Sequence, residues 1–253
     1  MANWMPGALI SLLVALPVTV ALMIAREEWR SATPLLKRQA WISLATIPPN
    51  VAMYLLLAPL WATTYVTAES IAWTSIEVTW SSVIFIVLAC DLSYYVEHTC
   101  GHRVGFIWRL YHGTHHTGED YHVPLAYRVN ALNHLLAPAF YLPWVLIGFD
   151  PMLVLGGQLF VFHYQAWLHT ERIGRLGWLD RWFNTPATHR VHHSRATEHQ
   201  HVNLGGLTML WDRLFGSYHP PVDDVRYGLM DVEDPRTFLG VYRGPWQKVR
   251  DSE

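Results

Sequence analysis

Three short clusters of histidine constrain this chain more than any other feature of its sequence. Residues three or four positions apart share one face of a helix, so each cluster can direct two or three imidazole rings at one point. Neutral imidazole is a good ligand for iron and zinc, and eight such groups exceed what one catalytic metal with an open position requires. The spacing therefore predicts helices that assemble a two-metal site. The clustered residues are His98 and His102; His112, His115 and His116; and His189, His192 and His193.

Long apolar segments predict that the chain is an integral membrane protein. Its 253 residues are 51% hydrophobic and 15% charged, and they include 13 Trp and 12 Tyr, as is typical of membrane proteins. Apolar runs cover residues 6–25, 41–66, 71–90 and 135–168. Pro48 and Pro49 should interrupt the second run, and a turn signal at residues 148–151 divides the last into a helical hairpin. We therefore expect four to five membrane-embedded helices in an all-α bundle.

Basic residues predict the orientation of these helices. Lys and Arg are concentrated in residues 26–38 and after Arg172, so the positive-inside rule places both regions, and all three histidine clusters, on the cytoplasmic side. With no internal repeat or linker, residues 1–253 are expected to form one domain, with residues 85–230 as its core.

Cys90 and Cys100 are too few for a disulfide framework, and a cytoplasmic position should keep both thiols reduced. A net charge of −2 gives no basic stripe for nucleic acid. A multi-pass protein of a bacterial inner membrane fits this pattern.

The histidines belong to longer ordered motifs: DxxYYxxHxxxH from Asp91, WxxxHxxHH from Trp108 and NTPxxHRVHH from Asn184. In this order they resemble the fatty acid hydroxylase and sterol desaturase superfamily, whose members are membrane-bound non-haem di-iron enzymes. Within that superfamily, QAWLHTE from Gln165 and WDRLFG from Trp211 look most like the alkylglycerol monooxygenase branch. The likeness covers about residues 91–229, over half of the chain.

The resemblance implies a helical bundle with a cytoplasmic cap that holds two iron ions. It adds His169 as a ninth ligand and favours Asp91 and Glu171 as acids that orient the ligand imidazoles. No catalytic residue is assigned beyond the metal ligands. At Arg103 the alkylglycerol branch has an acidic residue, and at Thr188 it tends to have a further histidine. We therefore carry over the chemistry of the superfamily and not the ether-lipid substrate.

Several functions are compatible with these motifs. We expect hydroxylation of a C–H bond in a lipid-like substrate, such as a sterol, a carotenoid, a fatty acyl chain or a membrane lipid. A desaturase on the same scaffold is the main alternative. A zinc-dependent membrane hydrolase is less favoured because the chain has no HExxH motif with its glutamate base. Since no GxGxxG fingerprint or cysteine set is present to hold a redox cofactor, electrons should come from an external ferredoxin or cytochrome.

Overall fold

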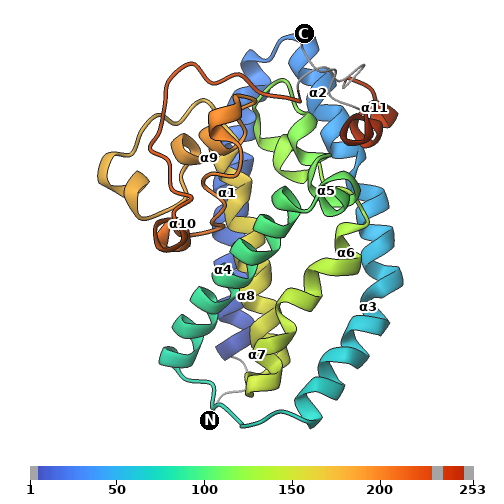
Figure 1. The fold of residues 1–253 in the computed structure, drawn as a ribbon, viewed down its shortest axis with the longest axis vertical. Helices are drawn as coiled ribbons and strands as arrows, with labels where there is room; N and C mark the ends of the chain where they lie inside the picture. The colour runs from blue at the N-terminus through green and yellow to red at the C-terminus, as the bar shows by residue number, and fades with distance from the viewer. Residues whose placement is uncertain (1–4, 230–235, 248–253) are drawn as a thin grey trace.

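Long helices side by side make up most of the molecule (Figure 1). The computed structural model describes residues 5–229 and 236–247, so the predicted domain of residues 1–253 extends beyond them at both ends. Within these ranges the protein is helical, as predicted, and its only β-structure is an isolated bridge between Phe183 and Thr208. The four longest helices are α1 (Met5–Ser31), α3 (Ile47–Ser70), α4 (Trp80–Arg103) and α8 (Pro151–Tyr164). α8 packs between α1 and α4.

Two described segments are long and apolar enough to cross a membrane: Pro34–Ser70, and α4. The first consists of α2 (Pro34–Ala45) followed by α3. The chain breaks between them at Thr46, because Pro48 and Pro49 occupy the first turn of α3 and cannot continue α2. The predicted interruption is therefore confirmed.

The predicted apolar helix of residues 71–90 is wrong in its bounds, because α4 starts nine residues later, at Trp80. Hydrogen bonds hold the preceding segment in a non-helical conformation: the Trp73 N–H donates to the Leu146 carbonyl (2.8 Å) and the Ile76 N–H to the Gly148 carbonyl (2.9 Å). Thr79 and Ser82 then form a capping box that starts the helix. Hydropathy alone does not register these contacts.

The apolar run of residues 135–168 forms short helical pieces followed by α8. These pieces are α6 (Asn133–Leu136), a 3-10 turn (Ala137–Phe140) and α7 (Leu142–Ile147). Gly148 ends α7 with a φ of 124°, which favours glycine, and Asp150 caps α8 through the backbone N–H groups of Met152 and Leu153. The predicted break at residues 148–151 is thus confirmed.

The main apolar core lies where α3, α4, α7 and α8 meet. Its fully buried members include Ile86, Cys90, Val145, Val154 and Val161. Gly157 lets α8 approach α4 closely, since a Cβ at this position would lie 2.7 Å from the Cys90 sulfur. Cys90 therefore has a packing role, and neither it nor Cys100 forms a disulfide.

Short elements gather at one end of the long helices (Figure 1). They are α5 (Gly105–Ile107), a π-helical turn (Trp108–His112), 3-10 turns at His115–Thr117, Val123–Tyr127, Gln165–Leu168, Gly177–Arg181, Thr197–His199 and Gly244–Trp246, α9 (Pro186–His192), α10 (Leu210–Phe215) and α11 (Phe238–Arg243). This end carries the clustered histidines.

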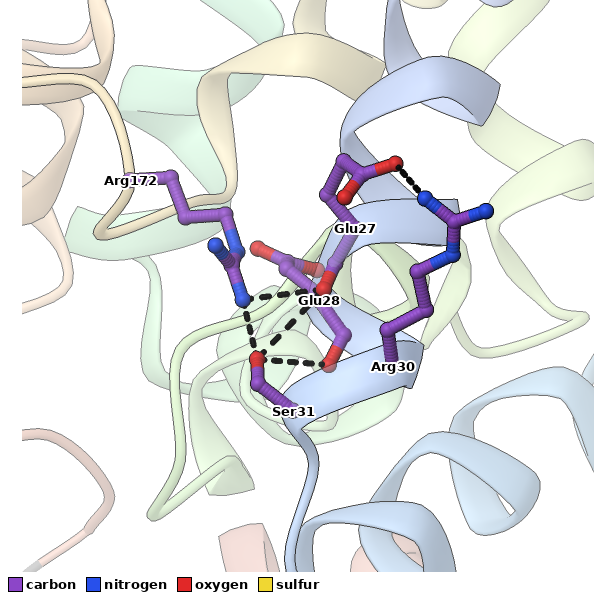
Figure 2. A network of polar contacts seen from close by, with 5 residues as sticks. All are labelled: Glu27, Glu28, Arg30, Ser31 and Arg172. Carbon is purple, nitrogen blue, oxygen red and sulfur yellow. Dashed lines mark hydrogen bonds and ion pairs between the residues drawn. The ribbon is translucent and has the colours of Figure 1, made fainter.

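The last turn of α1 is joined to the segment that follows His169 (Figure 2). Arg172 donates hydrogen bonds to the Glu27 carbonyl (2.9 Å) and to the Ser31 hydroxyl. Glu28, which is buried, accepts hydrogen bonds from the Thr170 hydroxyl (2.5 Å) and the Val123 N–H (3.0 Å). The basic segment of residues 26–38, which begins in the last turns of α1, and the basic region from Arg172 onward therefore lie at the same end of the bundle.

Candidate metal centre

The structure brings all eight clustered histidines and His169 together in two adjoining groups. In each group, one nitrogen from every ring lies within 4.8 Å of the others. The five-histidine group contains His98, His102, His112, His116 and His192, and the four-histidine group contains His115, His169, His189 and His193.

The third cluster is divided between the two groups by the geometry of α9. Thr185 and Thr188 form a capping box at its start, and Pro186 occupies its first turn, so the helix begins at a defined residue. His189 and His193 are four residues apart and share a face directed at the four-histidine group. His192 points to the other group, because successive helical residues diverge by about 100°.

The second cluster is divided in the same way. His112 ends the π-helical turn, a rare conformation that is frequent at functional sites, and joins His116 in the five-histidine group. His115 faces the other group. The expectation that each cluster points at a single site therefore holds only for His98 and His102, which lie one turn apart on α4.

The five-histidine group contains ring nitrogens that converge without other partners. The Nε2 atom of His112 lies 2.8 Å from that of His98 and 3.0 Å from that of His116. The Nε2 atoms of His102 and His192 are buried and have no hydrogen-bond partner among the described residues. Buried polar nitrogens without a partner are costly, so this arrangement calls for a cation among them.

In the four-histidine group, the Nε2 atoms of three rings surround the Nε2 atom of the fourth, His169. The Nε2 atom of His169 lies 3.1 Å from that of His115 and 3.2 Å from those of His189 and His193. Metal–imidazole bonds are about 2.1 Å long, so neighbouring ligands at right angles have nitrogens about 3.0 Å apart. The observed separations fit a set of donors around a metal ion, and both groups pass this test.

Backbone carbonyls fix the tautomer of three of these histidines. The Nδ1 atom of His98 lies 2.8 Å from the Leu204 carbonyl, that of His169 lies 2.9 Å from the Gln165 carbonyl, and that of His192 lies 2.9 Å from the Val202 carbonyl. Because a carbonyl only accepts hydrogen bonds, each Nδ1 must carry the proton. The Nε2 lone pairs are then directed at the centre of each group, as metal binding requires.

Burial keeps the histidines outside α4 neutral. It lowers the pKa of His169 to about 3 and that of His192 to about 4, because the charged imidazolium loses its hydration. Burial also places the pKa values of five others well below the usual 6.5: His112, His115, His116, His189 and His193. Neutral rings near pH 7 have their lone pairs available for a metal.

The two acids predicted to orient imidazoles hold the chain segments around the site. Asp91, which is fully buried, accepts hydrogen bonds from the N–H groups of Leu207 (2.7 Å) and Thr208 (3.1 Å) and from the indole of Trp211 (3.0 Å). Glu171 accepts a hydrogen bond from the Tyr227 hydroxyl (3.0 Å). Among the described residues, the hydrogen bonds of the two carboxylates go to these neighbouring segments and not to a histidine ring, so an orienting role remains a prediction.

Sequence reasoning missed the support beneath His98. Asp212 is fully buried, and its two oxygens accept hydrogen bonds from the N–H groups of Leu204 (2.7 Å) and Gly205 (2.8 Å). It thereby fixes the carbonyl that orients His98. The WDRLFG motif includes Asp212, but its role depends on a backbone turn that the sequence does not reveal.

The Val202 carbonyl that orients His192 is held by strained backbone. His201 and Asn203 flank it with φ values of 64° and 54°, a left-handed conformation that is uncommon outside glycine. The Asn203 amide compensates by donating hydrogen bonds to the Thr188 and His219 carbonyls, both 3.0 Å away. Strain of this kind persists where the surroundings hold it, often at functional sites.

The part of the sequence that carries the two histidine groups matches a known protein family. Residues 83–217, which include the nine histidines, match the fatty acid hydroxylase family. The match covers more than half of the chain, so the chain belongs to this family, as its motifs predicted. Together with the two apolar segments, family membership supports association with a membrane.

Characterised relatives also resemble the chain. Alkylglycerol monooxygenase of Homo sapiens is 39% identical over 152 residues, which cover 60% of this chain and 33% of that protein. The enzyme of the same name from Caenorhabditis elegans is 32% identical over 185 residues, covering 67% of this chain and 34% of that protein. Ornithine lipid hydroxylase OlsE of Rhizobium tropici is 29% identical over 150 residues, which cover 55% of this chain and 42% of that protein.

These similarities confirm the resemblance to the alkylglycerol monooxygenase branch. The chain spans about a third of the length of the alkylglycerol monooxygenases it matches. No solved structure matches it.

Proposed function

We propose that this chain is a membrane-bound non-haem oxygenase that uses two iron ions, O2 and external electrons to hydroxylate a C–H bond of a lipid-like substrate. The observation that carries this proposal is the meeting of nine buried or half-buried histidines in two adjoining groups. Family membership supports it, as do relatives named as a monooxygenase and a lipid hydroxylase.

Each histidine group would hold one iron ion. The groups adjoin, since the ring centroids of His192 and His193, one from each group, lie 5.2 Å apart. When bound, iron supplies the O2-derived oxidant for an unactivated C–H bond, which no side chain can provide. The chain would contribute the nine ligands, three of which have a tautomer fixed by a backbone carbonyl, and Asp91 and Glu171 would support the neighbouring segments.

The substrate should be an apolar or amphiphilic molecule that reaches the site from the bilayer. Two relatives carry names that refer to an alkylglycerol and to an ornithine lipid, and both of these are lipids. A membrane lipid is therefore the substrate class that we favour over a sterol or a carotenoid. The electrons would come from a separate ferredoxin or cytochrome.

The proposal includes a bundle of four to five membrane-embedded helices with the metal centre on the cytoplasmic side of a bacterial inner membrane. Beyond the two candidate spans, α1 and the shorter apolar segment Asn133–Ile147 would supply further embedded helices. The shared location of the two basic regions, joined through Arg172, supports a single cytoplasmic end.

Mass spectrometry of lipids from producing cells tests this function. Cells making the intact chain, together with a ferredoxin and its reductase, are compared with cells making the variant His192→Ala, His193→Ala. His163→Ala is the matched control, because His163 lies outside both groups and its Nδ1 contacts only the Leu159 carbonyl of its own helix.

A lipid that gains one oxygen with the intact chain and the control, but not with the double variant, supports hydroxylation. Loss of two hydrogens from the lipid would instead indicate the desaturase. Metal analysis of protein purified without O2 provides the second test. Two irons per chain are expected, whereas zinc in both groups would contradict the oxygenase proposal.

A further inference from the structure

An exposed apolar surface lies on the short elements beside the metal centre. We call it the cap patch, and its members come from residues 176–183 and 210–215. Trp178 and Leu214 are each 66% exposed and Phe215 is 58% exposed, although all three are large and apolar. The remaining members are Leu176, Trp182, Phe183 and Leu210. Contiguous apolar surfaces of this kind mark interaction sites.

The two segments of the cap patch form one surface. Phe183 and Thr208 make the isolated antiparallel bridge, and the Met209 N–H donates a hydrogen bond to the Trp182 carbonyl (2.9 Å). Arg213 strengthens this link, because its Nε atom donates to the Arg181 carbonyl (2.6 Å). The exposed rings are therefore held in place together and do not lie on independent loops.

The outward charge of the cap patch is positive only. Arg181 and Arg213 are exposed, and the Arg213 guanidinium lies 5.3 Å from the ring centroid of Trp182. The two acids of these segments, Asp180 and Asp212, are buried and accept hydrogen bonds from inside the protein. Tryptophan and arginine on one surface, without exposed acids, match the interface of a bilayer with anionic headgroups.

The cap patch packs against α4. Phe215 stacks on Tyr95 of α4 with ring centroids 5.4 Å apart, and Figure 1 shows α10 beside this helix. Tyr95 lies fifteen residues after Trp80, the exposed first residue of α4, which is about 22 Å along the helix axis. If Trp80 lies at one face of a hydrocarbon core about 30 Å thick, Phe215 reaches the boundary near the other face.

We propose that the cap patch is seated in the interface of the membrane that α4 crosses, with its apolar rings at the boundary between acyl chains and headgroups and with Arg181 and Arg213 at anionic lipid phosphates. A segment with such a face lies in the plane of the interface, with its apolar side chains 5–10 Å deep. The inference rests on membrane association and not on the iron chemistry.

Depth-dependent fluorescence quenching tests whether the cap patch lies in the membrane interface. Cys90 and Cys100 are first replaced by alanine in a common background, and a fluorescent label is attached at Leu214→Cys or Trp178→Cys. Glu198→Cys is the control, since Glu198 is exposed on a turn outside the patch. The full chain is placed in vesicles whose lipids carry a quencher near the headgroup end of the acyl chain.

Strong loss of fluorescence at positions 214 and 178, with little loss at 198, is expected. A label at 214 that behaves like the label at 198, and is quenched instead by a water-soluble quencher, would overturn the proposal and leave the patch for a protein partner. Each labelled chain must bind as much metal as the unlabelled background, so that altered folding is detected separately.

Varying the lipid composition of the vesicles tests the proposed contact between the arginines of the cap patch and anionic lipid. Adding phosphatidylglycerol to phosphatidylcholine vesicles should increase quenching at 214, and Arg181→Gln should remove that increase. Arg195→Gln, an exposed arginine outside the patch, should retain it. An increase unaffected by Arg181→Gln would contradict recognition of anionic lipid by this residue.

Discussion

Side-chain orientation at the metal centre depends on single backbone contacts. Leu204, Gln165 and Val202 each present a carbonyl to a histidine Nδ1, and Asp212 in turn fixes Leu204. These contacts place the lone pairs before any metal arrives, so less ordering is left for the binding step. We therefore expect residues that do not contact the metal to influence its affinity.

Replacement of Asp212 by asparagine should weaken metal binding by the five-histidine group. The amide side chain has one acceptor oxygen instead of two, so either Leu204 or Gly205 loses its partner and the carbonyl that orients His98 shifts. Loss of such support usually costs 10–100-fold in affinity, and we expect about that range here.

Chelator competition on the purified protein measures this effect. Asp223→Asn is the matched control, because Asp223 is exposed and pairs only with Arg175. Equal metal affinities for the Asp212 and Asp223 variants would mean that the turn at Leu204 keeps its conformation without the Asp212 carboxylate.

The start of helix α9 is determined by the local sequence. α9 begins with a capping box in which the Thr185 hydroxyl accepts from the Thr188 N–H and the Thr188 hydroxyl accepts from the Thr185 N–H. Thr188, where the alkylglycerol branch tends to have a further histidine, thus serves the helix start in this chain.

Replacement of Thr185 by alanine should destabilise the protein by about 1 kcal/mol, the usual cost of losing a threonine N-cap. The same change should weaken metal binding, since α9 supplies ligands to both groups. Thermal unfolding in detergent measures the first effect. Thr197→Ala is the control, because the Thr197 hydroxyl contacts only its exposed neighbour Glu198. Identical unfolding midpoints for the two variants would contradict a stabilising role for the cap.

The sequence was sufficient to predict that helices bring the histidines together. Residues four positions apart lie on one face of a helix, and this is the spacing of His98 and His102 and of His189 and His193. It was not sufficient to divide His192 from His193, since that depends on how α9 is rotated against the bundle. Nor did it place the start of α4, because the carbonyls of Leu146 and Gly148 that hold the preceding segment come from a distant part of the chain.

At the scale of the whole molecule, the buried neutral histidines make stability depend on pH. Each has a pKa near 6.5 when unfolded and a lower one when folded, about 3 for His169 and about 4 for His192. Between these values the unfolded chain binds more protons, so folding stability is fully present above pH 6.5 and declines as the pH falls toward 4.

The metal-free protein should therefore lose unfolding free energy on acidification from pH 7.5 to pH 5, at up to about 1.4 kcal/mol per pH unit for each such group. Chemical denaturation in detergent at several pH values measures it. A metal-loaded sample should resist acid further, because protons must displace the ion. A flat profile for the metal-free protein would show that these rings are already charged or hydrated in the fold.

The adjacent positions of His192 and His193 have a mechanical consequence. The peptide bond between His192, the last residue of α9, and His193 links the two histidine groups, so we expect an ion held in either group to restrain the helix that the other group also uses. On this basis we expect the second ion to bind more tightly than the first. Titration with less than two equivalents of iron should consequently divide the molecules into empty and doubly filled populations, with few that hold a single ion.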